Sequence, residues 1–123
     1  MRLHHVNVVV PPGRTDDVVG FYAALGLTRV PKPADAGSPL GAWFDVPGGT
    51  QVHVSERDGA PNPEQHFALV LDDFDGVLAA LAAAGHPVSP AGPMSGARRV
   101  NTADPVGNKV ELIEPVGPFG PFA

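Results

Sequence analysis

The first part of the chain contains a short apolar block, followed by a segment whose apolar residues have the spacing of a helix. The block HHVNVVV ends at Pro11-Pro12 and is typical of a β-strand. The segment from Thr15 to Leu25 instead spaces its apolar residues with a helical period, and Gly26 is placed to end it. Thr15 stands where a helix-capping side chain is expected. The pattern predicts a strand followed by a helix.

The same order recurs about 60 positions later, as an internal repeat. HFALVLDD predicts a second strand, Asp73 can cap a second helix, and Gly85 is placed to stop it. Each helix precedes a looser stretch and then two β-like segments joined by a glycine-containing turn. These segments are GAWFDV and TQVHV in the first half, and RRVNTA and NKVELIE in the second. We therefore expect an α+β fold of two βαβββ modules.

The repeat fits within one domain over residues 1–123. The modules cover about residues 1–58 and 64–116, and residues 117–123 form a tail. A hydrophobic content of 43% is enough to close a core at this length. One module alone exposes an apolar sheet face that must be covered by the other module or by a second chain. A homodimer is expected for this reason.

Composition restricts the ligand and the compartment. The net charge of −5, with no basic cluster beyond Arg98-Arg99, argues against binding to nucleic acid or to an anionic membrane. No apolar stretch approaches the ~20 residues of a membrane span. The N-terminal segment, with His4, His5 and Asn7, is too polar for a signal-peptide core, so we expect a cytoplasmic protein. A small-molecule substrate is the expected partner.

Three histidines and one glutamate occupy related places in the repeat. His5 and His66 lie near the starts of the first strands, and His53 and Glu111 lie on the last strands of the two modules. A pseudo-twofold axis between the modules brings such positions together. Because the chain has no cysteine, a metal ion must be held by nitrogen and oxygen donors. Imidazole and carboxylate suit Fe, Ni, Co, Mn or Zn, so the identity of the metal stays open.

Other conspicuous side chains have simpler interpretations. Trp43 on its strand fits core packing better than an aromatic wall for a ligand. Arg98 and Arg99 point to opposite faces of a strand, so at most one of them can pair with a substrate carboxylate or phosphate, and a solvated arginine is the simpler expectation. His4 alternates away from His5, and His86 follows the end of a helix as a surface turn residue does. We expect none of these to bind a metal.

Four motifs resemble the vicinal oxygen chelate superfamily, which includes glyoxalase I, bleomycin-resistance proteins and extradiol dioxygenases. They are the LHHV opening, the FYAALGL helix end, the HFALVLDD strand and the DPVGNKVEL close, and together they span nearly the whole chain. The resemblance implies a half-open barrel around one divalent metal ion. Its ligand positions map onto His5, His53, His66 and Glu111.

The resemblance implies a metal-dependent lyase or isomerase of glyoxalase type, acting on a small substrate through two adjacent oxygens, with Glu111 and His53 as catalytic residues. Glyoxalase I usually has a carboxylate in place of His53, whereas extradiol dioxygenases use two histidines and one glutamate. His53 is therefore either a fourth ligand or an acid–base group outside the metal's ligand set. A dioxygenase and a non-catalytic drug-binding protein of the bleomycin-resistance kind are the alternatives, and the acidic charge suits a cationic antibiotic. Whether one chain or two build the site is left open.

Overall fold

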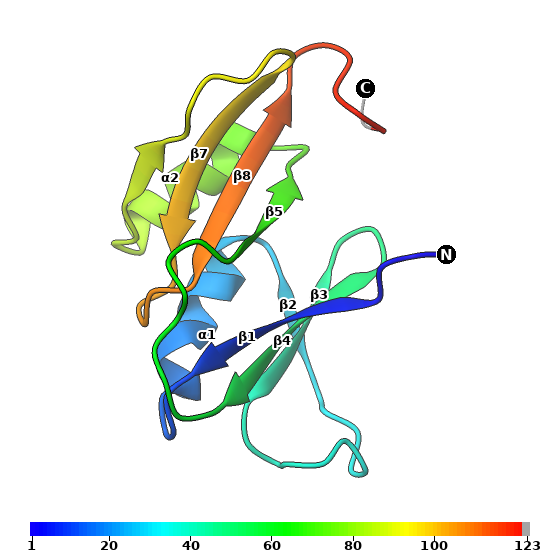
Figure 1. The fold of residues 1–123 in the computed structure, drawn as a ribbon, viewed down its shortest axis with the longest axis vertical. Helices are drawn as coiled ribbons and strands as arrows, with labels where there is room; N and C mark the ends of the chain where they lie inside the picture. Colours follow the sequence, from blue (N-terminus) through cyan, green and yellow to red (C-terminus); the bar gives the residue numbers. More distant parts are fainter. Residues whose placement is uncertain (122–123) are drawn as a thin grey trace.

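The computed structural model describes residues 1–121 and contains the two expected βαβββ modules (Figure 1). The last two residues of the expected 117–123 tail therefore lie outside the described residues. In chain order the elements are β1 (His5–Val10), α1 (Thr15–Ala24), β2 (Thr28–Val30), β3 (Ala42–Val46), β4 (Thr50–Glu56), β5 (His66–Val70), α2 (Phe74–Ala83), β6 (Val88–Pro90), β7 (Ala97–Ala103) and β8 (Lys109–Pro115). The α+β prediction is confirmed.

Each module forms its own four-stranded mixed sheet. The strand orders are β1-β4-β3-β2 and β5-β8-β7-β6, so the two sheets have the same topology. The first and last strands of each module pair in parallel, and the other neighbours pair antiparallel. The two sheets do not join into a closed barrel, and β1 and β5 are each one of the two edge strands of their sheet. The short strands β2 and β6 lie within the stretches that the sequence pattern left without regular structure.

The two helices begin in different ways. Asp73 caps α2 as expected, because its carboxylate accepts a hydrogen bond from the backbone N–H of Gly76 at 3.1 Å. The prediction that Thr15 caps α1 is wrong, because Thr15 is already in the helix. Its hydroxyl donates to Glu56, at 2.7 Å, and the backbone N–H of Gly13 donates to the same carboxylate at 2.7 Å. The start of α1 is therefore tied to the end of β4, which local sequence does not reveal.

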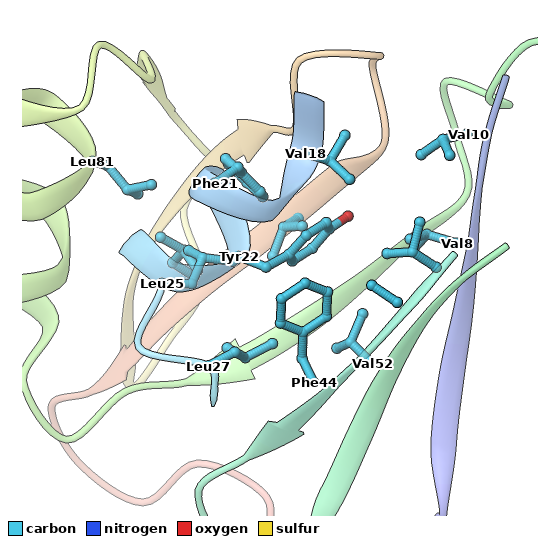
Figure 2. Close-up of a cluster of buried hydrophobic side chains, with 14 of the residues drawn as sticks. Val8, Val10, Val18, Phe21, Tyr22, Leu25, Leu27, Phe44, Val52 and Leu81 are labelled. Atoms are coloured by element: carbon cyan, nitrogen blue, oxygen red, sulfur yellow. The ribbon is translucent and has the colours of Figure 1, made fainter. Parts of the chain in front are cut away.

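One hydrophobic core serves both modules. Helix α1 contributes Phe21 and Tyr22, which are fully buried. Figure 2 shows Tyr22 beside Phe44 of β3, and Leu81 of α2 belongs to the same cluster. The core also includes Leu112 of β8. Because α1 packs against elements of both modules, neither half has a complete core of its own.

The DPVGN segment between β7 and β8 fastens the second module to the first. The buried carboxylate of Asp104 accepts hydrogen bonds from the Tyr22 hydroxyl at 2.8 Å and from the backbone and side-chain amides of Asn108, both at 2.9 Å. The Asn108 side chain also donates to the backbone carbonyl of Val9 in β1, at 2.9 Å. Burial, the Asp104 charge and the hydrogen bond to it raise the pKa of Tyr22 far above its usual value. The DPVGN segment thus joins the two modules.

Among the described residues, neither helix is of a length and apolarity that would let it cross a bilayer.

Candidate metal centre

The faces of the two sheets that point away from the shared core carry the candidate donors. We call these the open faces. In the first module, Val52 and Val54 of β4 point into the core, so the intervening His53 lies on the open face. In the second, Val110 and Leu112 of β8 are buried in the core, and Glu111 lies on the open face. Strand alternation therefore puts both side chains on the open faces of their sheets.

In the first module His53 lies between two other rings. His5 of β1 stacks on one face, with ring centroids 4.0 Å apart, and Trp43 of β3 stacks on the other, also at 4.0 Å. This stacking explains why His53 is only 8% exposed on an otherwise open face. Trp43 was expected to pack in the core, and instead it forms one wall of this histidine site.

Hydrogen bonds orient the His53 ring. The Gln51 side-chain amide donates to Asp45 at 2.9 Å, so its carbonyl oxygen points toward His53 Nε2, 2.8 Å away. A neutral His53 ring then donates from Nε2 and keeps its lone pair on Nδ1. Burial, followed by the charges of His5, His4 and Lys32, lowers the pKa of His53 to about 4. At neutral pH the ring is uncharged, the form that binds a metal or accepts a proton.

His4 does not alternate away from His5, because β1 begins only at His5. Its Nδ1 lies 2.9 Å from His5 Nδ1, and its ring meets the His5 ring edge-on at 5.1 Å. His86, by contrast, packs edge-on against Phe21 of the core at 5.2 Å, away from the open faces.

In the second module the donors are His66 of β5 and Glu111 of β8. His66 Nε2 lies 3.4 Å from Glu111 Oε2. Donors bound to one ion at ~2.0–2.2 Å each can lie at most about 4.4 Å apart, so this spacing fits a shared metal ion. A hydrogen bond at the other ring nitrogen sets the orientation of the His66 ring, since Nδ1 lies 3.0 Å from the Glu64 carbonyl oxygen. A metal-binding histidine typically has such a second contact.

Arg99 was expected to be solvated and was not placed among the site residues. The expectation that Arg98 and Arg99 face opposite ways is confirmed, but Arg99 is not solvated, since its side chain is only 15% exposed. Its guanidinium pairs with Glu111 Oε1 and donates to the Gly92 carbonyl. Arg98 lies on the other face, where it pairs with Glu114 and Asp75. Little in the sequence indicated this contact, because Arg99 comes within reach of Glu111 only through the register of β7 against β8.

The four predicted donors thus lie in two pairs. His5 and His53 form a first half-site on module 1, and His66 and Glu111 form a second half-site on module 2. Within residues 1–121, no three side chains of the metal-binding types gather closely enough to hold an ion. A cleft of about 670 Å³ runs between the modules, lined by β1, the 57–65 connection and the start of β5, including His66.

Comparison with known proteins agrees with this architecture. The family model described as the Glyoxalase/Bleomycin resistance protein/Dioxygenase superfamily matches residues 2–112. A glyoxalase family protein from Bacillus anthracis superposes with a TM-score of 0.85 and 26% identity, covering 94% of this chain and 95% of that chain.

More distant structures share the fold. Lactoylglutathione lyase from Agrobacterium tumefaciens has a TM-score of 0.67 and 23% identity, with 92% of each chain covered. The fosfomycin resistance protein FosX from Listeria monocytogenes has a TM-score of 0.72 and 17% identity, over 90% of this chain and 88% of that one. A comparison with the sequences of curated proteins gives no match.

Proposed function

Because the chain belongs to the Glyoxalase/Bleomycin resistance protein/Dioxygenase superfamily, we propose that it is a divalent-metal-dependent enzyme, a lyase or isomerase of glyoxalase type. Its substrate is a small molecule bound through two adjacent oxygens. One observation carries the proposal: two donor pairs lie at repeat-related positions on the open faces of the two modules. A member that only sequesters a ligand has no need for such a donor set.

The proposed assembly is a homodimer in which each metal site combines two chains. His5 and His53 supply the first half-site, and His66 of the partner subunit and Glu111 of the partner subunit supply the second. A twofold axis then creates two equivalent sites. The edge strands β1 and β5 support this arrangement, since each begins with a donor and has one edge free to lie beside another chain.

The donor chemistry fits Fe, Ni, Co, Mn or Zn, with uncharged imidazole from His53 and a carboxylate from Glu111. An ion held by these residues would polarise the two substrate oxygens bound to it and would stabilise the negative charge that develops on them. Arg99 holds Glu111 Oε1, so Oε2 is the oxygen left to bind. His53 has one lone pair, on Nδ1, so it serves either as the fourth ligand of the ion or as a proton acceptor beside the ion, with Glu111 as the second catalytic group.

Metal binding is the first test. The purified protein, prepared without oxygen, is titrated with each of the five ions by calorimetry. We expect one ion per chain, and a strong loss of affinity in Glu111→Gln and His66→Ala. His86→Ala is the matched control, because this histidine lies outside both half-sites. If the wild-type protein binds none of the ions stoichiometrically, the enzyme assignment fails.

Mixing two inactive variants tests the shared site. His5→Ala damages the first half-site and Glu111→Gln the second, so each homodimer has no intact site. A mixed dimer unites both defects in one site and leaves the other intact, so random exchange of subunits restores about one quarter of the wild-type capacity. Sites built within one chain give no restoration. Light scattering on the same samples determines whether the protein is a dimer.

The reaction is assigned with the loaded protein and a substrate panel. Thiol adducts of 2-oxoaldehydes test the glyoxalase-type reaction, and catechols with oxygen test the alternative dioxygenase reaction. Turnover of the first class alone, lost in Glu111→Gln, is the expected result.

A further inference from the structure

Each histidine of the first half-site has one ring nitrogen in contact with a neighbouring side chain. His5 Nδ1 lies 2.9 Å from His4 Nδ1, and His53 Nε2 lies 2.8 Å from the side-chain carbonyl oxygen of Gln51. The nitrogen that remains is therefore Nε2 in His5 and Nδ1 in His53. The two rings do not offer equivalent atoms.

The stacking of the two rings also separates their lone pairs. The ring centroids of His5 and His53 are 4.0 Å apart, and the ring planes are inclined by 15°. The lone pair of an imidazole lies in the plane of its ring, and a bond from nitrogen to zinc is ~2.0–2.1 Å long. Two stacked planes at so small an angle meet only well beyond such a bond length. In this arrangement an ion held by His5 is out of reach of the His53 lone pair.

A chain of two hydrogen bonds across β3 and β4 orients His53. Asp45 is in register with Gln51, and Trp43 is in register with His53. A carboxylate only accepts hydrogen bonds, so the Gln51 amide group faces Asp45, at 2.9 Å, and its carbonyl oxygen faces His53. Moving the ring proton to Nδ1 would set two acceptors against each other at one of these contacts. Trp43, stacked at 4.0 Å and inclined by 3°, holds the ring in its plane.

Burial increases along this chain of side chains. Asp45 is exposed, Gln51 is half-buried and His53 is buried. The charge at the exposed end therefore acts on the buried ring through the amide between them. Since the buried ring depends on Gln51 for its partner at Nε2, the orientation of one amide decides which ring nitrogen carries the lone pair.

We propose that Gln51 and Asp45 are positioning residues, which keep the proton of His53 on Nε2 and reserve its Nδ1 as a proton acceptor outside the ligand set of the ion. The inference rests on the proposed function for the use of Nδ1, whereas the position of the ring proton is a property of the metal-free protein. In the proton transfer, a bond between hydrogen and a carbon or oxygen of the substrate breaks, its electron pair stays on the substrate, and Nδ1 binds the proton. The ring then carries a positive charge, which the Asp45 carboxylate offsets through Gln51.

The proton on His53 can be located by NMR in the metal-free protein. In protein labelled with ¹⁵N-histidine, at neutral pH, correlations to the ring carbon protons distinguish a nitrogen that carries hydrogen from one with a lone pair. The set of signals lost in His53→Gln is assigned to His53. His86 is the internal control, because it packs against Phe21 away from the open faces.

Two substitutions reverse the polarity of the hydrogen-bonded chain. Asp45→Lys replaces an acceptor by a donor, so the Gln51 amide must turn and present its NH₂ group to His53 Nε2. Gln51→Lys places a donor directly at Nε2, whereas Gln51→Glu keeps an acceptor there. The matched control is Asp58→Lys, which makes the same charge change at an exposed position beyond the far end of β4.

We expect the proton on Nε2 of His53 in the wild type, in Gln51→Glu and in Asp58→Lys. Asp45→Lys and Gln51→Lys should each shift the ratio of the two tautomers toward Nδ1–H by about 3- to 10-fold, as for the exchange of one neutral hydrogen bond. A merely structural role of Asp45 would not move the proton of a ring that it does not touch.

Metal affinity tests whether His53 is outside the ligand set. In calorimetry with the ion that the wild type binds most tightly, His53→Gln should stay within about twofold of the wild type. His5→Ala should lose more than about tenfold, since it removes a ligand. If His53→Gln does not fold, the zinc-loaded wild type gives the same answer by NMR, because the Nε2 resonance of His5 should move and the Nδ1 resonance of His53 should not.

Three results overturn the inference: a proton on Nδ1 of His53 in the wild type, an unchanged tautomer ratio in Asp45→Lys, or equal losses of metal affinity in His53→Gln and His5→Ala. Failure of the wild type to bind any of the ions is a separate result, which ends the proposed function. In that case the tautomer ratios still decide whether Asp45 and Gln51 set the position of the ring proton. Circular dichroism checks the fold of each variant, and Asp45→Lys, on an exposed side chain, keeps the test valid if Gln51→Lys does not fold.

Discussion

Removing one hydroxyl group from the core should loosen the junction between the modules. In Tyr22→Phe the ring remains and no cavity forms, but Asp104 loses the hydrogen bond that the phenol donates at 2.8 Å. Both residues are buried, with Tyr22 0% and Asp104 3% exposed, so water cannot replace the lost donor. The substitution isolates one contact between α1 and the loop that precedes β8.

The magnitude follows from the hydrogen bonds that remain. A hydrogen bond to a charged group contributes about 1.5–3 kcal/mol. Asp104 retains three donors, the backbone N–H groups of Val106 and Asn108 and the Asn108 side chain, so its charge is not left unpaired. We therefore expect a loss of ~2 kcal/mol in the free energy of unfolding, or a fall in Tm of roughly 8 °C for a chain of this size.

Titration of the phenol gives a second, independent readout. The raised pKa of Tyr22 in the folded protein stabilises the fold below the ordinary tyrosine pKa of 10.0, and this contribution is lost as pH rises above that value. The chain has one tyrosine, so the ultraviolet absorbance of tyrosinate reports Tyr22 alone. Native protein should show no ionisation near pH 10.0, and the signal should appear only together with unfolding.

Denaturant unfolding at fixed protein concentration measures the loss, since an oligomer's stability depends on concentration. The reasoning is refuted if Tyr22→Phe unfolds within about 0.5 kcal/mol of wild type, the range of ordinary surface substitutions. It is also refuted if the folded wild-type protein titrates with the pKa of a free phenol.

Three further substitutions test local features of the fold. Gly41→Ala should lower the free energy of unfolding by more than ~2 kcal/mol, because Gly41 has a φ of +86° and the new Cβ would clash with the Val54 carbonyl oxygen. Gly48→Ala is the milder control in the same unfolding assay, because Gly48 has a φ of +105° but open space around it. Hydrogen bonds from Gly13 and Thr15 lower the pKa of Glu56, so the contribution of Glu56 to stability is present above the usual carboxyl pKa of 4.5 and is lost as the pH falls. On acid titration, Glu56→Gln should therefore lose less stability than the wild-type protein, and parallel curves for the two proteins would contradict this. Asp73→Ala removes the cap of α2 and should cost ~1 kcal/mol in thermal unfolding, whereas Asp73→Asn should stay close to wild type.

Periodicity was enough to predict the elements that bury one face. The strands around His53 and Glu111 have apolar neighbours on both sides, so their orientation followed from the alternation. The strands β2 and β6 were not located, because three residues, exposed or half-buried and next to prolines, carry no alternating pattern. Contacts between distant segments could not be predicted from local sequence either. Thr15 is 41 positions from Glu56, and its hydroxyl donates to that carboxylate instead of capping its own helix.

The donor residues were named from the repeat, but their environment was not. The stack of Trp43 and His5 on His53 depends on the register of three strands, and the pairing of Arg99 with Glu111 depends on the offset of β7 against β8. Neither register is encoded in a short motif. The sequence therefore indicated which side chains carry the chemistry, and the fold was needed to show which neighbours control them.

The placement of two aromatic side chains gives the unmodified protein a separate optical reporter for each of its two regions. The chain contains one tryptophan, and its indole lies flat against the His53 ring, so its fluorescence responds to events at the first half-site. Its one tyrosine lies instead at the junction with the DPVGN segment. Ligand binding and opening of the module junction can therefore be followed at different wavelengths in one sample, without a label and without a substitution.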